Sequence, residues 1–149
     1  MGAVPHPYST CATAGTLPTN ATIAGHTLGA TNDFTRAAGY YANAAGTNLT
    51  SQAFAGADVV YTWTAPANGP TTVRIHPDPT WDIGVLVMSA CAPNSALAAA
   101  DANGSGRPET VTFNAVQGTT YYVVADYFSS STLSYSATTV GGFLLSVQQ

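Results

Sequence analysis

The stretch DVVYTWTA, residues 58–65, decides the fold. Val59, Tyr61 and Trp63 fall on one side of an extended chain, and Val60 and Thr62 fall on the other. This period of two, carried by β-branched and aromatic residues, predicts a β-strand. The sequence PANGP that follows, at residues 66–70, is a strong turn signal and ends the strand.

The same kind of run recurs along the rest of the chain. Residues 81–90 are apolar on both faces, which predicts a central strand that is covered on both sides. Residues 91–107 read as a long connection, in which 96–102 is the only helix-permissive run. The predicted strands are short, and turn signals separate them. This pattern predicts an all-β fold, an antiparallel sandwich or barrel of about seven to nine strands. The other predicted strands are 71–76, 109–115, 120–128, 133–137 and 143–147, with edge strands at 19–24 and 52–55.

The chain has the length of one domain. Its 149 residues are enough to bury a sizeable core without a metal or a disulfide. No linker divides the strand-rich region. We therefore predict an N-terminal tail or edge segment at residues 1–18 and a single β-sandwich domain at residues 19–149.

Charge is scarce, and this excludes several functions. Charged residues make up 7% of the chain, against about 25% in an average domain, and the net charge is −4. Arg36, Arg74 and Arg107 are the only cationic side chains besides histidine and lie far apart, so neither nucleic acid nor anionic lipid is an expected partner. No apolar stretch is long enough for a membrane span. Thr, Ser, Asn and Gly take the place of charged residues, and such a neutral polar surface is typical of secreted β-proteins. Residues 1–22 nevertheless show no signal peptide.

Five segments carry a resemblance to a known family. They are GHTLGATND at 25–33, GADVVYTWTAPANG at 56–69, WDIGVLV at 81–87, QGTTYYVVAD at 117–126 and FLLSV at 143–147. In this order and spacing they resemble the bacterial pre-peptidase C-terminal domains, in the variety found in secreted proteins of myxobacteria and their relatives. The resemblance covers about residues 20–148.

The resemblance implies a jelly-roll-like β-sandwich that serves as an accessory module of secreted proteins. Members of the family are often appended to proteases or other hydrolases. They have been linked to substrate attachment, secretion and maturation of the neighbouring enzyme, and some relatives bind calcium or collagen. The domain itself is not a peptidase.

The two cysteines, Cys11 and Cys91, are a disulfide candidate. In an oxidising compartment their bond would close a loop of about 80 residues and pin the N-terminal segment to the central connection. The alternative is two free thiols. A catalytic thiol is not predicted, because nothing cationic is placed to lower the pKa of either sulfur.

Acidic residues near strand ends are the calcium candidates. Calcium takes six to eight oxygen ligands that converge on one point, and no Asp-x-Asp-x-Asp loop supplies them locally. The alternative, which we favour, is that each carboxylate caps a turn through backbone N–H groups. No cofactor is therefore required, and calcium remains a candidate ligand of Asn32, Asp33, Asp82, Asp101 and Asp126.

Aromatic residues offer two interpretations. Those that alternate with Val in the strands, such as Tyr61, Trp63 and Tyr121, are expected in the core. The others could form an exposed row that stacks on sugars or docks against a polypeptide. These binding-face candidates are Tyr40, Tyr41, Tyr122, Phe128 and Tyr135.

No catalytic constellation emerges. His6, His26 and His76 fit no zinc spacing, and no serine stands in a nucleophile elbow. We predict a non-catalytic accessory module of a secreted bacterial protein, which binds an extracellular polysaccharide or protein. The alternative is a structural subunit of an extracellular fibre or matrix, whose copies join one another by strand addition.

Overall fold

A computed structural model describes residues 7–30, 45–47, 53–54, 57–79, 82–92, 95–101, 103–129 and 141–149. Apart from one 3-10 turn, η1 (Cys11–Thr13), the regular structure in these ranges is all β. The strands are β1 (Gly15–Thr16), β2 (Ala21–His26), β3 (Ala45–Thr47), β4 (Ala53–Phe54), β5 (Val59–Thr64), β6 (Gly69–Pro77), β7 (Ile83–Met88), β8 (Ala96–Ala100), β9 (Glu109–Ala115), β10 (Thr120–Ser129) and β11 (Gly142–Gln148).

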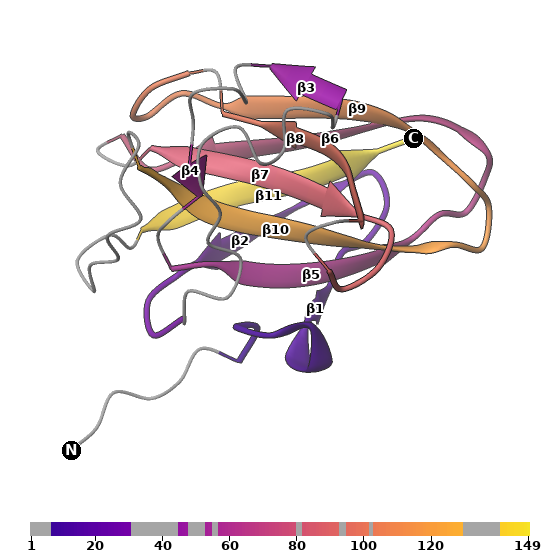
Figure 1. Cartoon of the computed structure of the whole chain (residues 1–149), viewed down its shortest axis with the longest axis horizontal. Coiled ribbons are helices and arrows are strands. Elements are labelled where there is room, and N and C mark those ends of the chain that lie inside the picture. Colours follow the sequence, from indigo (N-terminus) through magenta and orange to yellow (C-terminus); the bar gives the residue numbers. More distant parts are fainter. Residues whose placement is uncertain are drawn as a thin grey trace.

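The strands form two sheets that lie face to face (Figure 1). The larger sheet has the order β1-β5-β10-β7-β8-β3, and β4 adds to the end of β10. The smaller sheet has the order β2-β11-β6-β9. The long ladders are antiparallel, whereas the short edge strands β1 and β3 pair in parallel with β5 and β8. The all-β sandwich predicted from the sequence is confirmed.

The main core lies between the sheets, as the alternation in the sequence requires. The inward row of β5, with Val59, Tyr61 and Trp63, is at most 2% exposed. It packs with inward residues of the other strands, including Ile75 of β6 and Leu145 of β11, into one apolar cluster. Trp63 stacks on Tyr121 at 6.0 Å between ring centroids, which confirms the core assignment of these aromatics.

A second, smaller cluster covers the outer face of the larger sheet. Val60, Leu86 and Val124 point away from the main core and pack against Cys11 and Ala14 of the N-terminal segment. This segment is held by the bond from the Leu17 amide to the Thr62 carbonyl and by β1. The prediction that β7 is covered on both faces is confirmed, because all its residues from Ile83 to Met88 are buried.

One strand was missed in the sequence. Residues 96–100, predicted to lie in a long connection, form β8 and pair with β7. The alternation was invisible because alanine fills both faces, and Ala98, Ala99 and Ala100 are at most 1% exposed. Side chains this small allow close packing on both sides of the strand. The predicted strand at 133–137 lies outside the described residues.

Candidate functional site

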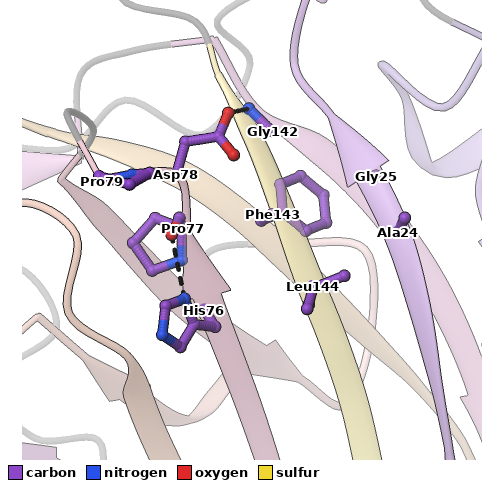
Figure 2. Close-up of a pocket in the computed structure, with 9 residues that line it drawn as sticks. All are labelled: Ala24, Gly25, His76, Pro77, Asp78, Pro79, Gly142, Phe143 and Leu144. Atoms are coloured by element: carbon purple, nitrogen blue, oxygen red, sulfur yellow. Dashed lines mark hydrogen bonds between the residues drawn. The ribbon is translucent and has the colours of Figure 1, made fainter.

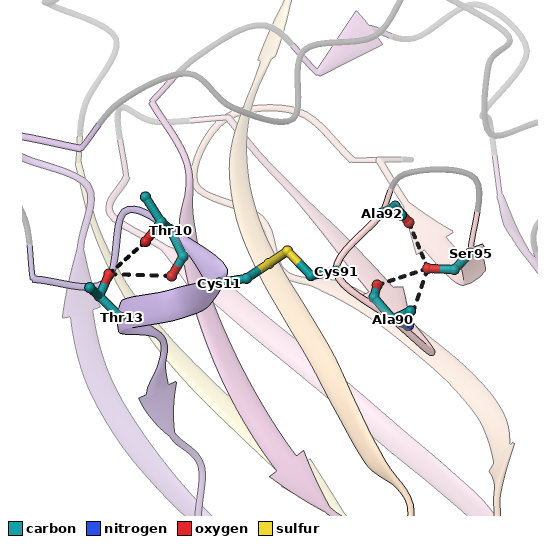
Figure 3. The surroundings of a disulfide bond; sticks show 7 residues. All are labelled: Thr10, Cys11, Thr13, Ala90, Cys91, Ala92 and Ser95. Carbon is teal, nitrogen blue, oxygen red and sulfur yellow. Dashed lines mark hydrogen bonds between the residues drawn. A yellow bond between two sulfur atoms is a disulfide. The ribbon is translucent and has the colours of Figure 1, made fainter.

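The disulfide predicted between Cys11 and Cys91 is present (Figure 3). It joins η1 to the loop after β7, with 6.1 Å between the two Cα atoms. Both ends are ordered locally. The Thr13 hydroxyl lies against Thr10, and the Ser95 hydroxyl donates to the carbonyls of Ala90 and Ala92. The bond therefore ties the N-terminal segment across the outer face of the larger sheet.

Three acidic side chains gather where β7 begins, β8 ends and β9 begins. We call this group the acid corner, and it consists of Asp82, Asp101 and Glu109. Asp101 is 2% exposed, Glu109 is 1% exposed and Asp82 is half-buried. Glu109 accepts a hydrogen bond through Oε1 from the amide of Asn103. Within the described part of the chain, Asp82 Oδ1 and Asp101 Oδ2 are buried and accept no hydrogen bond.

Burial and mutual repulsion weaken the acidity of this corner. Burial, and then the charge of Glu109, raise the pKa of Asp82 to about 6. Burial, followed by the charges of Asp82 and Glu109, raises the pKa of Asp101 to about 8. The neighbouring charges that act on the two aspartates are acidic and add to the effect of burial. Near neutral pH the Asp101 carboxyl therefore favours its protonated, uncharged form.

The structure brings together two of the five predicted calcium candidates. Asp82 and Asp101 belong to the acid corner, whereas Asp126 lies on β10 opposite Gly84. Asn32 and Asp33 lie outside the described residues. Sequence analysis missed Glu109, although a signal existed: it occupies the inward position of the alternation that Val111 and Phe113 continue.

The corner fits a hard cation only in part. Among the residues that the structure describes, no three His, Cys, Asp or Glu side chains converge closely enough to hold a metal ion. The two aspartate oxygens without donors could supply part of a calcium shell, with backbone carbonyls and water as the remaining oxygen ligands. The donors are all oxygens, which suits calcium better than zinc.

A groove lies on the outer face of the smaller sheet (Figure 2). This outer groove encloses about 330 Å³, within the range of small ligand sites. Its lining comes from β2 on one side, from the start of β11 and from the end of β6 with the turn that follows. The lining residues are Ala24, Gly25, His76, Pro77, Asp78, Pro79, Gly142, Phe143 and Leu144.

Two glycines make the outer groove possible. Gly25 lets β2 approach the core, since a Cβ there would lie 2.5 Å from Tyr61 Oη and 2.6 Å from the Phe143 ring. Gly142 leaves room for Asp78, since a Cβ there would lie 2.9 Å from Asp78 Oδ2. That oxygen instead accepts the Gly142 amide at 2.9 Å, and the Asp78 amide donates to the Gly142 carbonyl at 3.0 Å.

The groove combines an apolar surface with acceptor atoms. Leu144 is 51% exposed and faces outward beside His76, its partner in the ladder. His76 Nδ1 lies 3.0 Å from the Pro77 carbonyl, so in the neutral ring Nδ1 donates and Nε2 is an acceptor. Asp78 is exposed, and its carboxylate is a further acceptor. A ligand that carries hydroxyl or amide donors next to apolar carbon suits this lining.

Of the predicted binding-face aromatics, Tyr122 is the one whose side chain the structure describes, and it does not line this groove. Tyr122 is half-buried on the opposite sheet, where it packs on the second cluster with Val60 and Leu86. Tyr40, Tyr41 and Tyr135 lie outside the described residues, and the side chain of Phe128 is also outside them. An exposed aromatic row therefore stays a prediction.

Comparison with known proteins places the fold. No family model matches this chain, and no curated protein matches it. The structure is similar to the pre-peptidase C-terminal domain of collagenase from Bacillus anthracis, with a TM-score of 0.54, 16% identity and coverage of 90% of this chain and 93% of that one. Two weaker matches have a TM-score of 0.40 each. One is PliG of Aeromonas hydrophila, a periplasmic inhibitor of g-type lysozyme, with 16% identity and coverage of 90% of this chain and 96% of that one. The other is the C-terminal CBM6 of LamC from Zobellia galactanivorans, with 12% identity and coverage of 85% of this chain and 96% of that one.

The chain thus has the fold of a pre-peptidase C-terminal domain, as the resemblance of its sequence motifs implied. At 16% identity the likeness extends to the fold and not to a ligand. None of the helical structure in the described ranges has the length and apolar character that crossing a bilayer requires.

Proposed function

We propose that this protein is a non-catalytic accessory module of a secreted protein and that it attaches its parent to an extracellular polysaccharide or protein. The observation that carries the proposal is the outer groove, which offers acceptor atoms beside an apolar surface. His76 and Asp78 provide acceptors, and Leu144 provides an apolar contact. Among the described residues, His76 and Asp78 bond to backbone groups of Pro77 and Gly142 and not to a hydroxyl or thiol that could act as a nucleophile.

The disulfide supports an extracellular setting. Disulfides persist in oxidising compartments and are rare in the cytosol. Cys11 and Cys91 account for both cysteines of the chain, so the described structure keeps no free thiol. The scarcity of charge also suits a module whose surface recognises neutral ligands through hydroxyl and amide groups.

A retention assay on insoluble materials tests this function. The purified chain is incubated with cellulose, chitin, bacterial cell-wall material and collagen, and the bound fraction is measured. We expect retention on at least one material and a loss of at least tenfold in Leu144→Asp, which adds a charge to the groove. Val116→Asp is the matched control, because Val116 is 58% exposed and lies outside the groove. Retention on none of them, or equal retention of both variants, contradicts the proposal.

The alternative, a fibre subunit joined by strand addition, requires an open sheet edge. In the described part of the chain the smaller sheet has two edges, β9, which also lies against β3 and β8 of the larger sheet, and β2, which is largely exposed. The covered edge β9 is a poor template for a second chain, so β2 is the edge at which strand addition would occur. Sedimentation of the pure protein separates the functions, since filaments support the fibre and a monomer supports the binding module.

A further inference from the structure

We propose that Asn103 is a site of spontaneous deamidation, a modification that replaces its side-chain amide by a carboxylate beside the acid corner. The inference is independent of the outer groove. It starts from the pair Asn103-Gly104 in the loop between β8 and β9, where an exposed asparagine precedes a glycine. The consequence is a loop that becomes less stable as the protein ages.

The reaction uses the backbone nitrogen of the residue that follows the asparagine. The Gly104 nitrogen loses its proton and attacks Cγ of Asn103. A C–N bond forms, and the side-chain nitrogen takes up a proton and leaves as ammonia. Water then opens the cyclic imide at one of its two carbonyls, so that the hydroxyl stays on that carbon, the proton returns to the Gly104 nitrogen, and aspartate or isoaspartate results. A side chain after the asparagine hinders this ring closure, and glycine has none.

The structure leaves the attacking nitrogen accessible. Asn103 is exposed to water, and a Cβ built on Gly104 would meet no atom within 4 Å. Gly104 belongs to no strand, and within the described part of the chain its amide donates no hydrogen bond. Asn103 is held from the other side, because its backbone amide donates to Glu109 Oε1 at 2.5 Å and its Nδ2 donates to the Pro108 carbonyl at 2.8 Å. Ring closure therefore breaks no ladder of either sheet.

A second Asn-Gly pair, Asn68-Gly69, provides the comparison. Asn68 is also exposed, but its Oδ1 accepts the Gln117 amide at 2.8 Å. Gly69 is the first residue of β6 and pairs with Ala115 in the ladder with β9. Movement of the Gly69 nitrogen onto Cγ of Asn68 would disturb both the turn and the sheet. The two pairs are equal in sequence, and the structure predicts that Asn103 reacts first.

The new carboxylate weakens the loop that carries it. Nδ2 of Asn103 is a donor to the Pro108 carbonyl, and a carboxylate oxygen in its place is an acceptor that the carbonyl repels. The added negative charge is close in the chain to Asp101 and Glu109, both of which are buried acids. The isoaspartate product also lengthens the backbone by one methylene group, which shifts the amide bond to Glu109.

Incubation of the full chain at pH 8 and 37 °C tests the reaction. Peptide mass spectrometry and an isoaspartate assay follow Asn103 and Asn68 in the same sample. We expect Asn103 to convert at least tenfold faster than Asn68 in the folded protein, and the two rates to come within about threefold of each other in urea. Gly104→Ala should slow Asn103 at least tenfold and leave Asn68 unchanged, since the added Cβ has open space in the fold and hinders ring closure alone.

Asn103→Asp tests the consequence of the modification. The loss of one hydrogen bond in a chain of this length corresponds to a fall of roughly 3 °C in melting temperature, and we expect at least this change. Asn68→Asp is the matched control, because Asn68 acts as an acceptor and aspartate keeps that role toward the Gln117 amide. Its melting temperature should stay within 1 °C of the parent.

Three results would overturn the proposal. Conversion of Asn68 as fast as that of Asn103 in the folded protein, or of neither residue, would show that the loop does not favour the reaction. An unchanged rate at Asn103 in Gly104→Ala would exclude attack by the Gly104 nitrogen. An Asn103→Asp variant as stable as the parent would mean that the new charge has no effect on the loop, whatever the rate at which it forms.

Discussion

Removal of the disulfide provides the most quantitative test of the fold. Cys11 and Cys91 are separated by 80 residues, and the bond limits the freedom of the unfolded chain across that whole loop. In the chain-entropy model a loop of this size contributes about 4.5 kcal/mol to the free energy of unfolding. For a protein of about 150 residues this corresponds to about 13 °C in melting temperature. The double variant Cys11→Ser/Cys91→Ser should therefore remain folded but unfold at a much lower urea concentration.

Urea unfolding followed by tryptophan fluorescence measures this difference. Besides the lower free energy, we expect a larger m-value, because the unfolded chain without the cross-link exposes more surface. Addition of a reductant should destabilise the parent to the level of the double variant and leave the double variant unchanged. If reduction lowers the free energy by less than 1 kcal/mol, the loop argument fails. The N-terminal segment would then detach without unfolding the sandwich.

Three further predictions concern a buried tyrosine that titrates, a tightly packed glycine and a buried hydrogen bond. Burial, and then the nearby charge of Tyr8, raise the pKa of Tyr61 to about 12, above its usual 10. Because Tyr61 ionises first in the unfolded chain, the free energy of unfolding should fall as the pH rises from 10 to 12. In urea unfolding over that pH range, Tyr61→Phe should lose this part of the decrease. Gly25→Ala should cost about 1–3 kcal/mol through overpacking, whereas Gly104→Ala, which meets open space, should cost much less in the same urea assay. Thr19→Val should cost about 1–3 kcal/mol, because it removes the acceptor 2.8 Å from the buried indole nitrogen of Trp63, and an unchanged melting temperature would contradict that bond.

The strands of the core were predictable because apolar residues alternate with polar ones along them, and this alternation indicates which face is buried. The run at 109–115 alternates in sequence and in burial alike, whereas in the run at 58–65 Val60 on the outward face is buried too, under the N-terminal segment. Alanine gives no such signal, so β8 could not be recognised. The parallel pairing of β1 with β5 also could not be inferred, since two residues carry no pattern and the pairing depends on where the disulfide and η1 hold the chain.

The candidate sites were predictable only to the extent that local sequence implies contact. The disulfide followed from there being two cysteines, and Asp82 and Asp101 followed from acids at strand ends. Glu109 could have been added, because an acid at an inward strand position is unusual. The outer groove was out of reach, since it depends on Asp78 and Gly142, which are 64 residues apart and meet only through the pairing of β6 with β11.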